Sequence, residues 1–313
     1  MSSRLRLAAQ DYLTMRRALG FELVSQGRLL MQFVSYCEAH GLEQLRSDEA
    51  INWAAHPPKG GQDRVYQARR LGVVRDFARH LATIDPDTEV PAHDVLPYHA
   101  RHVCPHIYSH EQILLLIDAA AQLKPRLRAL TWQMLLALLA VTGMRISEAC
   151  NLNDDDIDVE RGTIRILNSK FKKSRQVLVH STTLVALEDY RQQRDLLWEP
   201  TTGSRALIVT SRGTRLNPEY ARQTFAKLIN ATGIQARAGQ HRPRLHDIRH
   251  SVAVWTLMGF YQDGGDVQAR LPLLSTWLGH VNPKSTYWYL HAVPELLALA
   301  ARRLEDDHGQ VPS

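Results

Sequence analysis

The sequence predicts a mainly α-helical protein with a small β-sheet. Apolar residues recur at helical spacing along most of the chain, and the pattern changes to short β-branched stretches between residues 157 and 180. A proline-rich run at 85–107 separates a short first part from a longer second part. With 313 residues the chain is long enough for two domains. We therefore expect a helical unit at 1–84, a linker at 85–107 and an α+β domain at 108–313.

The first part shows the pattern of about four helices. Residues 4–40 hold two apolar stripes, a short helix begins at Ser47, and the run 56–61 is a break rich in Pro and Gly. Another helix is expected at 63–83. The residues expected in the core are Leu5, Ala9, Tyr12, Leu13, Leu19, Leu29, Leu30, Phe33, Val34, Cys37, Val65, Leu71, Val74, Phe77, Ala78 and Leu81.

The second part begins with a capping signal. Ser109 followed by Gln112 is typical of a capping box before a helix that runs to Ala121. The next helix, over 126–141, should stop at Gly143. Short strands are expected around 157–159, 163–167 and 176–179, with a basic turn between the last two. Further helices are expected at 182–197, 217–231 and 246–258.

Composition favours a polyanionic partner without proving one. The formal charge is +6 and the sequence pI about 9.3, with most of the excess in residues 105–313, which hold 25 basic against 20 acidic residues. The three cysteines form no Cys-x-x-Cys pair, so a zinc cluster is not expected. No stretch has the length of a membrane span or the form of a secretory signal, and a reducing cytoplasm is the expected compartment.

Two arginines stand in positions suited to binding a phosphate. Arg145 follows a helix end and can present its planar guanidinium to two oxygens, although a salt bridge with Glu148 or with 154–156 explains it equally well. His246 and Arg249 are three residues apart, so on a helix they share a face. An exposed basic helix start is the alternative there.

Tyrosines follow a Gly-His pair near the C-terminus. His280 comes directly after Gly279, whose missing side chain permits close approach of the backbone to a ligand. Tyr287 and Tyr289 lie about 200° apart on a helix, so only one can face a given site. A tyrosine nucleophile needs help to lose its proton, because its unperturbed pKa is near 10, and neighbouring cations can provide it.

Three runs together resemble the tyrosine recombinase (phage integrase) family. They are Thr142–Leu152 with Arg145, Leu245–Ala253 with His246 and Arg249, and Leu278–Tyr289 with His280. The resemblance implies that both arginines are catalytic and that His246 is a proton-handling or phosphate-contacting partner. It also implies that His280 contacts the scissile phosphate and that Tyr289 is the nucleophile. Glu148 is expected to be structural, holding the arginine or a helix end, and His250, which points about a quarter turn from Arg249 on a helix, is expected to be structural as well. The 31-residue spacing between Arg249 and His280 is longer than in compact members, and we expect the extra residues in a glycine-rich loop at 261–266.

The family also carries a lysine in a strand-turn-strand, which protonates the leaving 5′ oxygen. Matching the family's Lys-x-x-Lys-x-Arg pattern to 170–175 selects Lys170, while Lys172 and Lys173 remain candidates. As an alternative, the turn only touches the DNA backbone, and this applies to Lys172, Lys173 and Arg175.

From the resemblance we expect a site-specific recombinase that forms a 3′-phosphotyrosyl link to double-stranded DNA, with neither cofactor nor metal. It implies an N-terminal helical core-binding (SAM-like) domain, a tyrosine recombinase catalytic domain and a homo-tetramer at synapsis, in which 294–302 docks on a neighbour. Accessory proteins are possible partners, and a mobile element is the favoured host. The alternatives are a DNA-binding protein that does not cut and a type IB topoisomerase-like relaxation activity.

Overall fold

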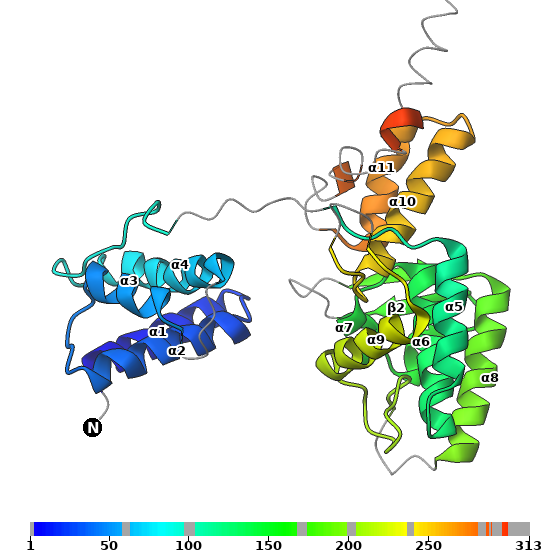
Figure 1. The fold of residues 1–313 in the computed structure, drawn as a ribbon, viewed down its shortest axis with the longest axis horizontal. Coiled ribbons are helices and arrows are strands. Elements are labelled where there is room, and N and C mark those ends of the chain that lie inside the picture. Colours follow the sequence, from blue (N-terminus) through cyan, green and yellow to red (C-terminus); the bar gives the residue numbers. More distant parts are fainter. Residues whose placement is uncertain are drawn as a thin grey trace, which may run out of the picture. The chain divides into compact units, whose positions relative to one another are not determined.

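The computed structural model describes residues 3–57, 63–96, 104–167, 174–198, 205–236, 241–280, 286–287, 289 and 296–299 (Figure 1). The chain divides into two compact units, residues 1–102 and 103–313. Each has an apolar core of its own. The expected class, mainly α with a small sheet, is confirmed.

The described residues of the first unit form four helices: α1 (Arg4–Ala18), α2 (Val24–Ala39), α3 (Ser47–Ala55) and α4 (Arg64–Leu81). The side chains of Ser3 and Asp63 cap α1 and α4 by accepting from backbone amides of the first turn. Most of the expected core is buried, but Leu19 is 67% and Val65 41% exposed, so these two predictions are wrong. Leu19 lies past the last turn of α1, and Val65 lies in the first turn of α4, where the packed stripe has not begun.

The first half of the expected linker is tied to this unit. Buried Arg75 donates from Nε to the carbonyl of Pro91 at 2.8 Å and from Nη2 to that of Ala92 at 2.7 Å. The amide of Glu89 donates to the carbonyl of Leu45 at 3.1 Å. Residues 89–92 therefore belong to the packing of the first unit.

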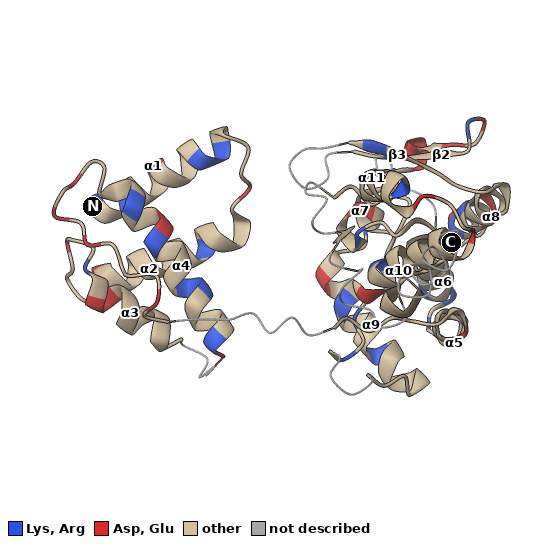
Figure 2. Cartoon of the chain, turned by 90° about the horizontal axis from the view of Figure 1, so that it is seen from above, with Lys and Arg blue, Asp and Glu red and all other residues tan. Residues whose placement is uncertain are grey.

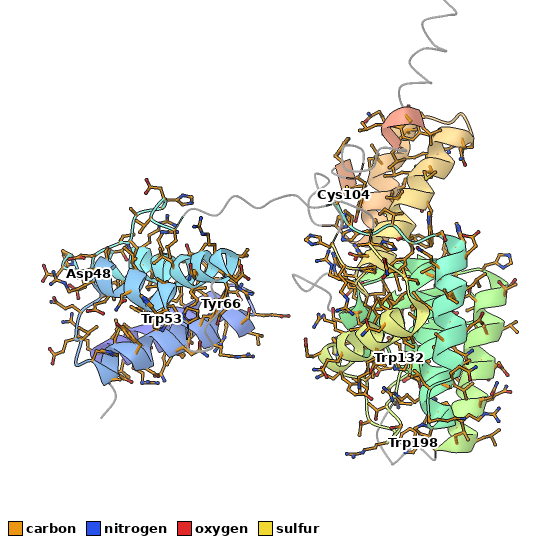
Figure 3. All side chains as sticks on the ribbon, viewed as in Figure 1. Asp48, Trp53, Tyr66, Cys104, Trp132 and Trp198 are labelled. Carbon is orange, nitrogen blue, oxygen red and sulfur yellow. The ribbon has the colours of Figure 1, made fainter. Side chains whose placement is uncertain are left out.

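The second unit is a helical assembly around α6. Its helices are α5 (His110–Ala121), α6 (Arg126–Thr142), α7 (Ile146–Asn151), α8 (Ser181–Leu197), α9 (Pro218–Thr232), α10 (Asp247–Gln262) and α11 (Val267–Leu278). The capping box of Ser109 and Gln112 is present, as expected. Helix α6 packs against α5, α8 and α10, and Trp132, labelled in Figure 3, is buried in this core.

A three-stranded antiparallel sheet lies beside these helices, in the order β1-β2-β3. Its strands are β1 (Ile157–Asp158), β2 (Thr163–Ile166) and β3 (Arg175–Leu178), which confirms the three predicted strands within two residues. Ile164 pairs with Val177, and both side chains join the core. Strand β3 also contacts α11, and Arg175 stands at the start of that strand.

The long interval between Arg249 and His280 is mostly helix. Helix α10 runs four residues beyond its predicted end, and α11 occupies most of the remaining interval. Only residues 263–266 connect the two helices. The expected loop at 261–266 is therefore shorter than predicted, and the added length forms a helical pair that packs together in a third apolar cluster.

Candidate active site

The site forms where α6 and α11 end. Both helices end on glycines in the left-handed region, Gly143 with φ 62° and Gly279 with φ 66°. The indole Nε1 of Trp277 donates to the carbonyl of Thr142 at 3.0 Å and joins the two helix ends. The last carbonyls of a helix lack internal partners and carry partial negative charge, so this junction attracts cations.

Arg249 fills this junction from α10. Its Nη1 donates to the carbonyl of Gly143 at 2.8 Å, and its Nη2 donates to the carbonyl of Leu278. The side chain is buried. Burial, followed by the charge of Arg145, lowers the pKa of Arg249 to about 10, which leaves it protonated at neutral pH.

Arg145 reaches the same junction from the start of α7. Its Nη2 donates to the carbonyl of Gly279 at 2.8 Å, and its Nη1 donates to Oε1 of Glu148 at 2.6 Å. One fifth of its side chain is exposed, so it can still meet a ligand. The expectation that Glu148 holds the arginine is confirmed, and the two interpretations of Arg145 are compatible.

Glu148 holds a second arginine as well. Arg175 donates from Nη2 to Oε2 of Glu148 at 2.8 Å and from Nη1 to Oε1 at 3.1 Å. Burial alone would raise the pKa of Glu148, but its hydrogen bonds to Arg175 and Arg145 outweigh burial and lower the pKa to about 2. One buried carboxylate therefore neutralises much of the charge of two guanidinium groups.

The guanidinium of Arg175 lies so close to Gly279 that no side chain fits at this position. A Cβ added at Gly279 would lie 2.7 Å from Nη1 of Arg175. Arg175 also donates from Nε to the carbonyl of Trp277 at 2.8 Å, and its side chain is 11% exposed. The close approach expected of Gly279 is thus an approach to a side chain of the protein. The predicted contact of Arg175 with DNA stays a prediction.

Tyr289 points into the site and Tyr287 does not. Tyr289 is 2% exposed and Tyr287 is 39% exposed. The Tyr289 hydroxyl lies 2.7 Å from Nδ1 of His250. Burial raises the pKa of Tyr289 to about 12, against the opposing influence of Arg249 and Arg145. Only one of the two tyrosines faces the arginine cluster, as the helical spacing predicts.

Histidines surround the phenol. Nδ1 of His280 lies 2.8 Å from Oγ1 of Thr286, and its ring stacks on Tyr289 with centroids 6.5 Å apart. His246 precedes α10 and is exposed, and its ring meets that of His250 edge to face at 4.8 Å. Arg249, expected on the same face as His246, instead turns into the protein.

Several predicted features fall outside the described residues. Lys170, Lys172 and Lys173 are among them, and so is most of 294–302. Leu296 is described, and it is buried in the same cluster as Tyr289. Within the described ranges, no group of three or more His, Cys, Asp or Glu side chains is arranged to hold a metal ion. None of the described helices has the length and apolarity to cross a membrane.

The sequence did not single out two contacts of this site. Arg175 appeared as part of a basic turn, and His250 appeared as a packing residue. The signals for Arg175 were its place as the arginine of the Lys-x-x-Lys-x-Arg pattern and its position just before a predicted strand. For His250 the signal was the adjacency to Arg249. None of these signals identifies a partner 27 or 39 residues away.

Known proteins similar to this chain match it over most of its length. Residues 107–295 match the model described as the phage integrase family. A putative integrase/recombinase, y4rB of Sinorhizobium fredii, is 38% identical over 97% of this chain and 98% of that protein. Tyrosine recombinase XerD of Bifidobacterium longum is 29% identical over 86% of this chain and 85% of its own.

Solved structures show the same fold. The Tn1549 transposon integrase in complex with a circular intermediate DNA superposes with a TM-score of 0.64 at 16% identity, covering 95% of this chain and 99% of that one. The XerH site-specific recombinase bound to palindromic difH substrate superposes with a TM-score of 0.63 at 17% identity, covering 90% and 79%.

Proposed function

Because the chain belongs to the phage integrase family of tyrosine recombinases, we propose that it cleaves and rejoins DNA at specific sites through a 3′-phosphotyrosyl link at Tyr289. The observation that carries the proposal is the burial of the Tyr289 phenol among Arg145, Arg249, His250 and His280. A phenol in such a cluster can be deprotonated, and a phosphate there finds fixed cations.

Arg145 and Arg249 stabilise the charge that builds on the non-bridging oxygens of the scissile phosphate. Both guanidinium groups are fixed by carbonyls at the ends of α6 and α11, so they are oriented before DNA arrives. Preorganised donors of this kind lower the barrier because they need no rearrangement in the transition state. Glu148 and Arg175 act behind them as positioning residues.

His246, whose ring meets that of His250, and His280, whose ring stacks on Tyr289, are the further phosphate contacts. Burial, followed by the charge of Arg249, lowers the pKa of His280 to about 4. A neutral imidazole can donate one N–H to a phosphate oxygen. For His280, Thr286 occupies Nδ1, which leaves Nε2 to face the substrate.

Lys170 protonates the 5′ oxygen that leaves when Tyr289 attacks. The covalent phosphotyrosyl link conserves the energy of the phosphodiester bond, so religation needs no ATP. Lys172 and Lys173 contact the DNA backbone, and a contact of Arg175 with DNA stays a prediction, because its guanidinium group is paired with Glu148.

Double-stranded DNA is the partner, and the first unit is the core-binding domain. Arg64, Arg69 and Arg79 are exposed along α4, where Figure 2 shows repeated basic positions. They suit sequence-independent contact with phosphates. A lambda integrase tetramer bound to a Holliday junction has the same fold. By analogy we propose a tetramer at synapsis, and the docking of 294–302 on a neighbour belongs to the same proposal. Accessory proteins can assist this assembly, and a mobile element is the favoured host.

The test uses DNA nicked near the cleavage point, taken from the flanks of this protein's own gene. Such suicide substrates trap a covalent adduct that survives SDS. Wild type and Tyr287→Phe should form the adduct, and Tyr289→Phe should not. An adduct lost only in Tyr287→Phe would show that Tyr287 is the nucleophile. DNA binding without any adduct would favour a protein that occupies its sites without cutting.

A leaving-group test separates the lysines. A 5′-phosphorothiolate substrate has a leaving group that needs no proton, so it should restore cleavage to Lys170→Ala. Rescue of Lys172→Ala instead would transfer the role to that residue. Relaxation of supercoiled DNA without a defined site would favour a type IB topoisomerase-like activity.

A further inference from the structure

His250 contacts the reacting oxygen of the proposed nucleophile. Its Nδ1 lies 2.7 Å from the Tyr289 hydroxyl, and the two ring centroids are 5.5 Å apart at an interplanar angle of 59°. A base must lie within about 2.6–3.2 Å of the group whose proton it removes, and His250 meets this condition before any substrate is bound. The contact spans 39 residues and joins α10 to the C-terminal segment.

We propose that His250 orients the Tyr289 hydroxyl and accepts its proton when the phenolic oxygen attacks the scissile phosphate. The inference rests on the proposed role of Tyr289. The O–H bond of Tyr289 breaks, its proton passes to Nδ1 of His250, and the oxygen–phosphorus bond forms. The bond from phosphorus to the 5′ oxygen breaks, and that oxygen takes a proton from the separate acid, Lys170. On religation His250 returns its proton to Tyr289.

The environment of Tyr289 favours such a base. Burial raises the pKa of the phenol to about 12, and Arg249 and Arg145 offset only part of this. Guanidinium groups stabilise a phenolate but cannot accept its proton, because they have no free lone pair. A neighbouring imidazole supplies the acceptor that the arginines lack.

His250 is kept neutral, and in the tautomer that carries its proton on Nε2 the Nδ1 atom accepts from the Tyr289 hydroxyl. Burial, followed by the neighbouring charges, lowers the pKa of His250 to about 3. The groups that face it are His246, Arg244, Arg249, His280 and Tyr289. A bound phosphate brings negative charge that offsets these cations, so the basicity of His250 should rise when DNA enters the site.

His246 and His250 then have different roles. His246 is exposed at the start of α10 and is available to the DNA. His250 lies one turn further, partly buried, with its ring against that of His246 at 4.8 Å. His246 is thus placed for the phosphate, and His250 for the nucleophile.

The experiment compares His250→Asn and His250→Phe in the full-length protein. Asparagine places a hydrogen-bonding amide near the position of Nδ1 but cannot take a proton, and phenylalanine keeps the ring shape alone. Single-turnover cleavage of the nicked substrate should slow by about 100-fold or more in both variants, with DNA binding and melting temperature retained. The matched control is His110→Asn, since His110 stacks on Trp255 and takes no part in the proposed chemistry.

A second measurement identifies the step. Replacing Tyr289 with 3,5-difluorotyrosine, whose phenol is more acidic, should restore most of the cleavage lost in His250→Asn. The 5′-phosphorothiolate substrate should restore none of it, because it relieves only the leaving group. This pattern is the reverse of the one expected for Lys170→Ala.

Three results would overturn the inference. If His250→Asn cleaved at the wild-type rate, His250 would have no role in cleavage. Faster cleavage would make His250 a latch that holds Tyr289 inward. Slow cleavage that difluorotyrosine does not relieve would make it a packing residue. A wild-type protein that binds DNA but forms no adduct would instead remove the proposed function itself, so the two failures are distinguishable.

Discussion

Arg175 binds both carboxylate oxygens of Glu148, at 2.8 and 3.1 Å, and so fastens the start of β3 to α7. The same carboxylate accepts from Arg145 at 2.6 Å. Glu148 is 3% exposed in its side chain, so this pairing takes place largely out of water. The carboxylate reduces the repulsion among the guanidinium groups of Arg145, Arg175 and Arg249 at the end of α11, because its negative charge offsets one of their three positive charges.

Glu148→Gln should therefore lower both stability and cleavage. Removing one partner of a buried pair leaves uncompensated charge and costs about 3–5 kcal/mol of unfolding free energy. Chemical denaturation gives this value, and the suicide substrate gives the cleavage rate. The control is Glu188→Gln, whose exposed ion pair with Arg191 should matter by less than about 1 kcal/mol. Equal effects of the two variants would contradict the role of Glu148.

Because of Glu148, the free energy of unfolding should also depend on pH. Its pKa is lowered in the folded state to about 2, so its contribution is fully present above the unfolded value near 4.5. That contribution, on the order of 3 kcal/mol, is lost as pH falls through this interval towards 2. Measured from pH 6 to pH 2, the stability gap between wild type and Glu148→Gln should narrow. A gap that stays constant would show that the charge of Glu148 is not the cause.

Gly279→Ala isolates the close approach of Arg175. An alanine at positive φ costs about 1–2 kcal/mol by itself. Gly233→Ala is the matched control, because Gly233 also ends a helix, at φ 69°, with no atom within 4 Å of an added Cβ. Gly279→Ala should cost more, since Arg175 would have to leave Glu148 and the carbonyl of Trp277. It should also slow cleavage, which Gly233→Ala should not. Similar melting temperatures and rates for both variants would argue against this account.

The sequence predicted those parts of the fold that depend on local signals. The capping box at Ser109, the glycine after α6 and the helical stripes of the first unit all appear where they were expected. Helix α11 was not predicted, since Pro272 within it reads as an interruption. The ends of helices could not be predicted to the residue either, because the last turn of a helix depends on tertiary packing.

The site divides in a similar way. The motif residues Arg145, Arg249, His280 and Tyr289 could be selected by resemblance, and the structure brings these four together. Their supports could not be predicted, because each is a contact across many residues. The carbonyl of Gly279 is 134 residues from Arg145, and its orientation depends on a left-handed helix end. Periodicity and spacing contain no information about such a pair.

Arg249→Lys should remove cleavage while leaving most of the DNA binding. The guanidinium of Arg249 donates to two carbonyls, those of Gly143 and Leu278, and its fork can also meet phosphate oxygens. A lysine ammonium is a point donor that cannot satisfy both carbonyls and a phosphate in the same geometry. The single-turnover rate should fall by about 100-fold or more. Electrophoretic mobility shift should report an affinity within a few-fold of wild type, because other basic residues supply most phosphate contacts.

Arg242→Lys is the control, since Arg242 is exposed and hydrogen-bonds to Asn230 of α9. If Arg249→Lys cleaves as fast as Arg242→Lys, the planar fork is not required and the assignment of Arg249 to the transition state is wrong.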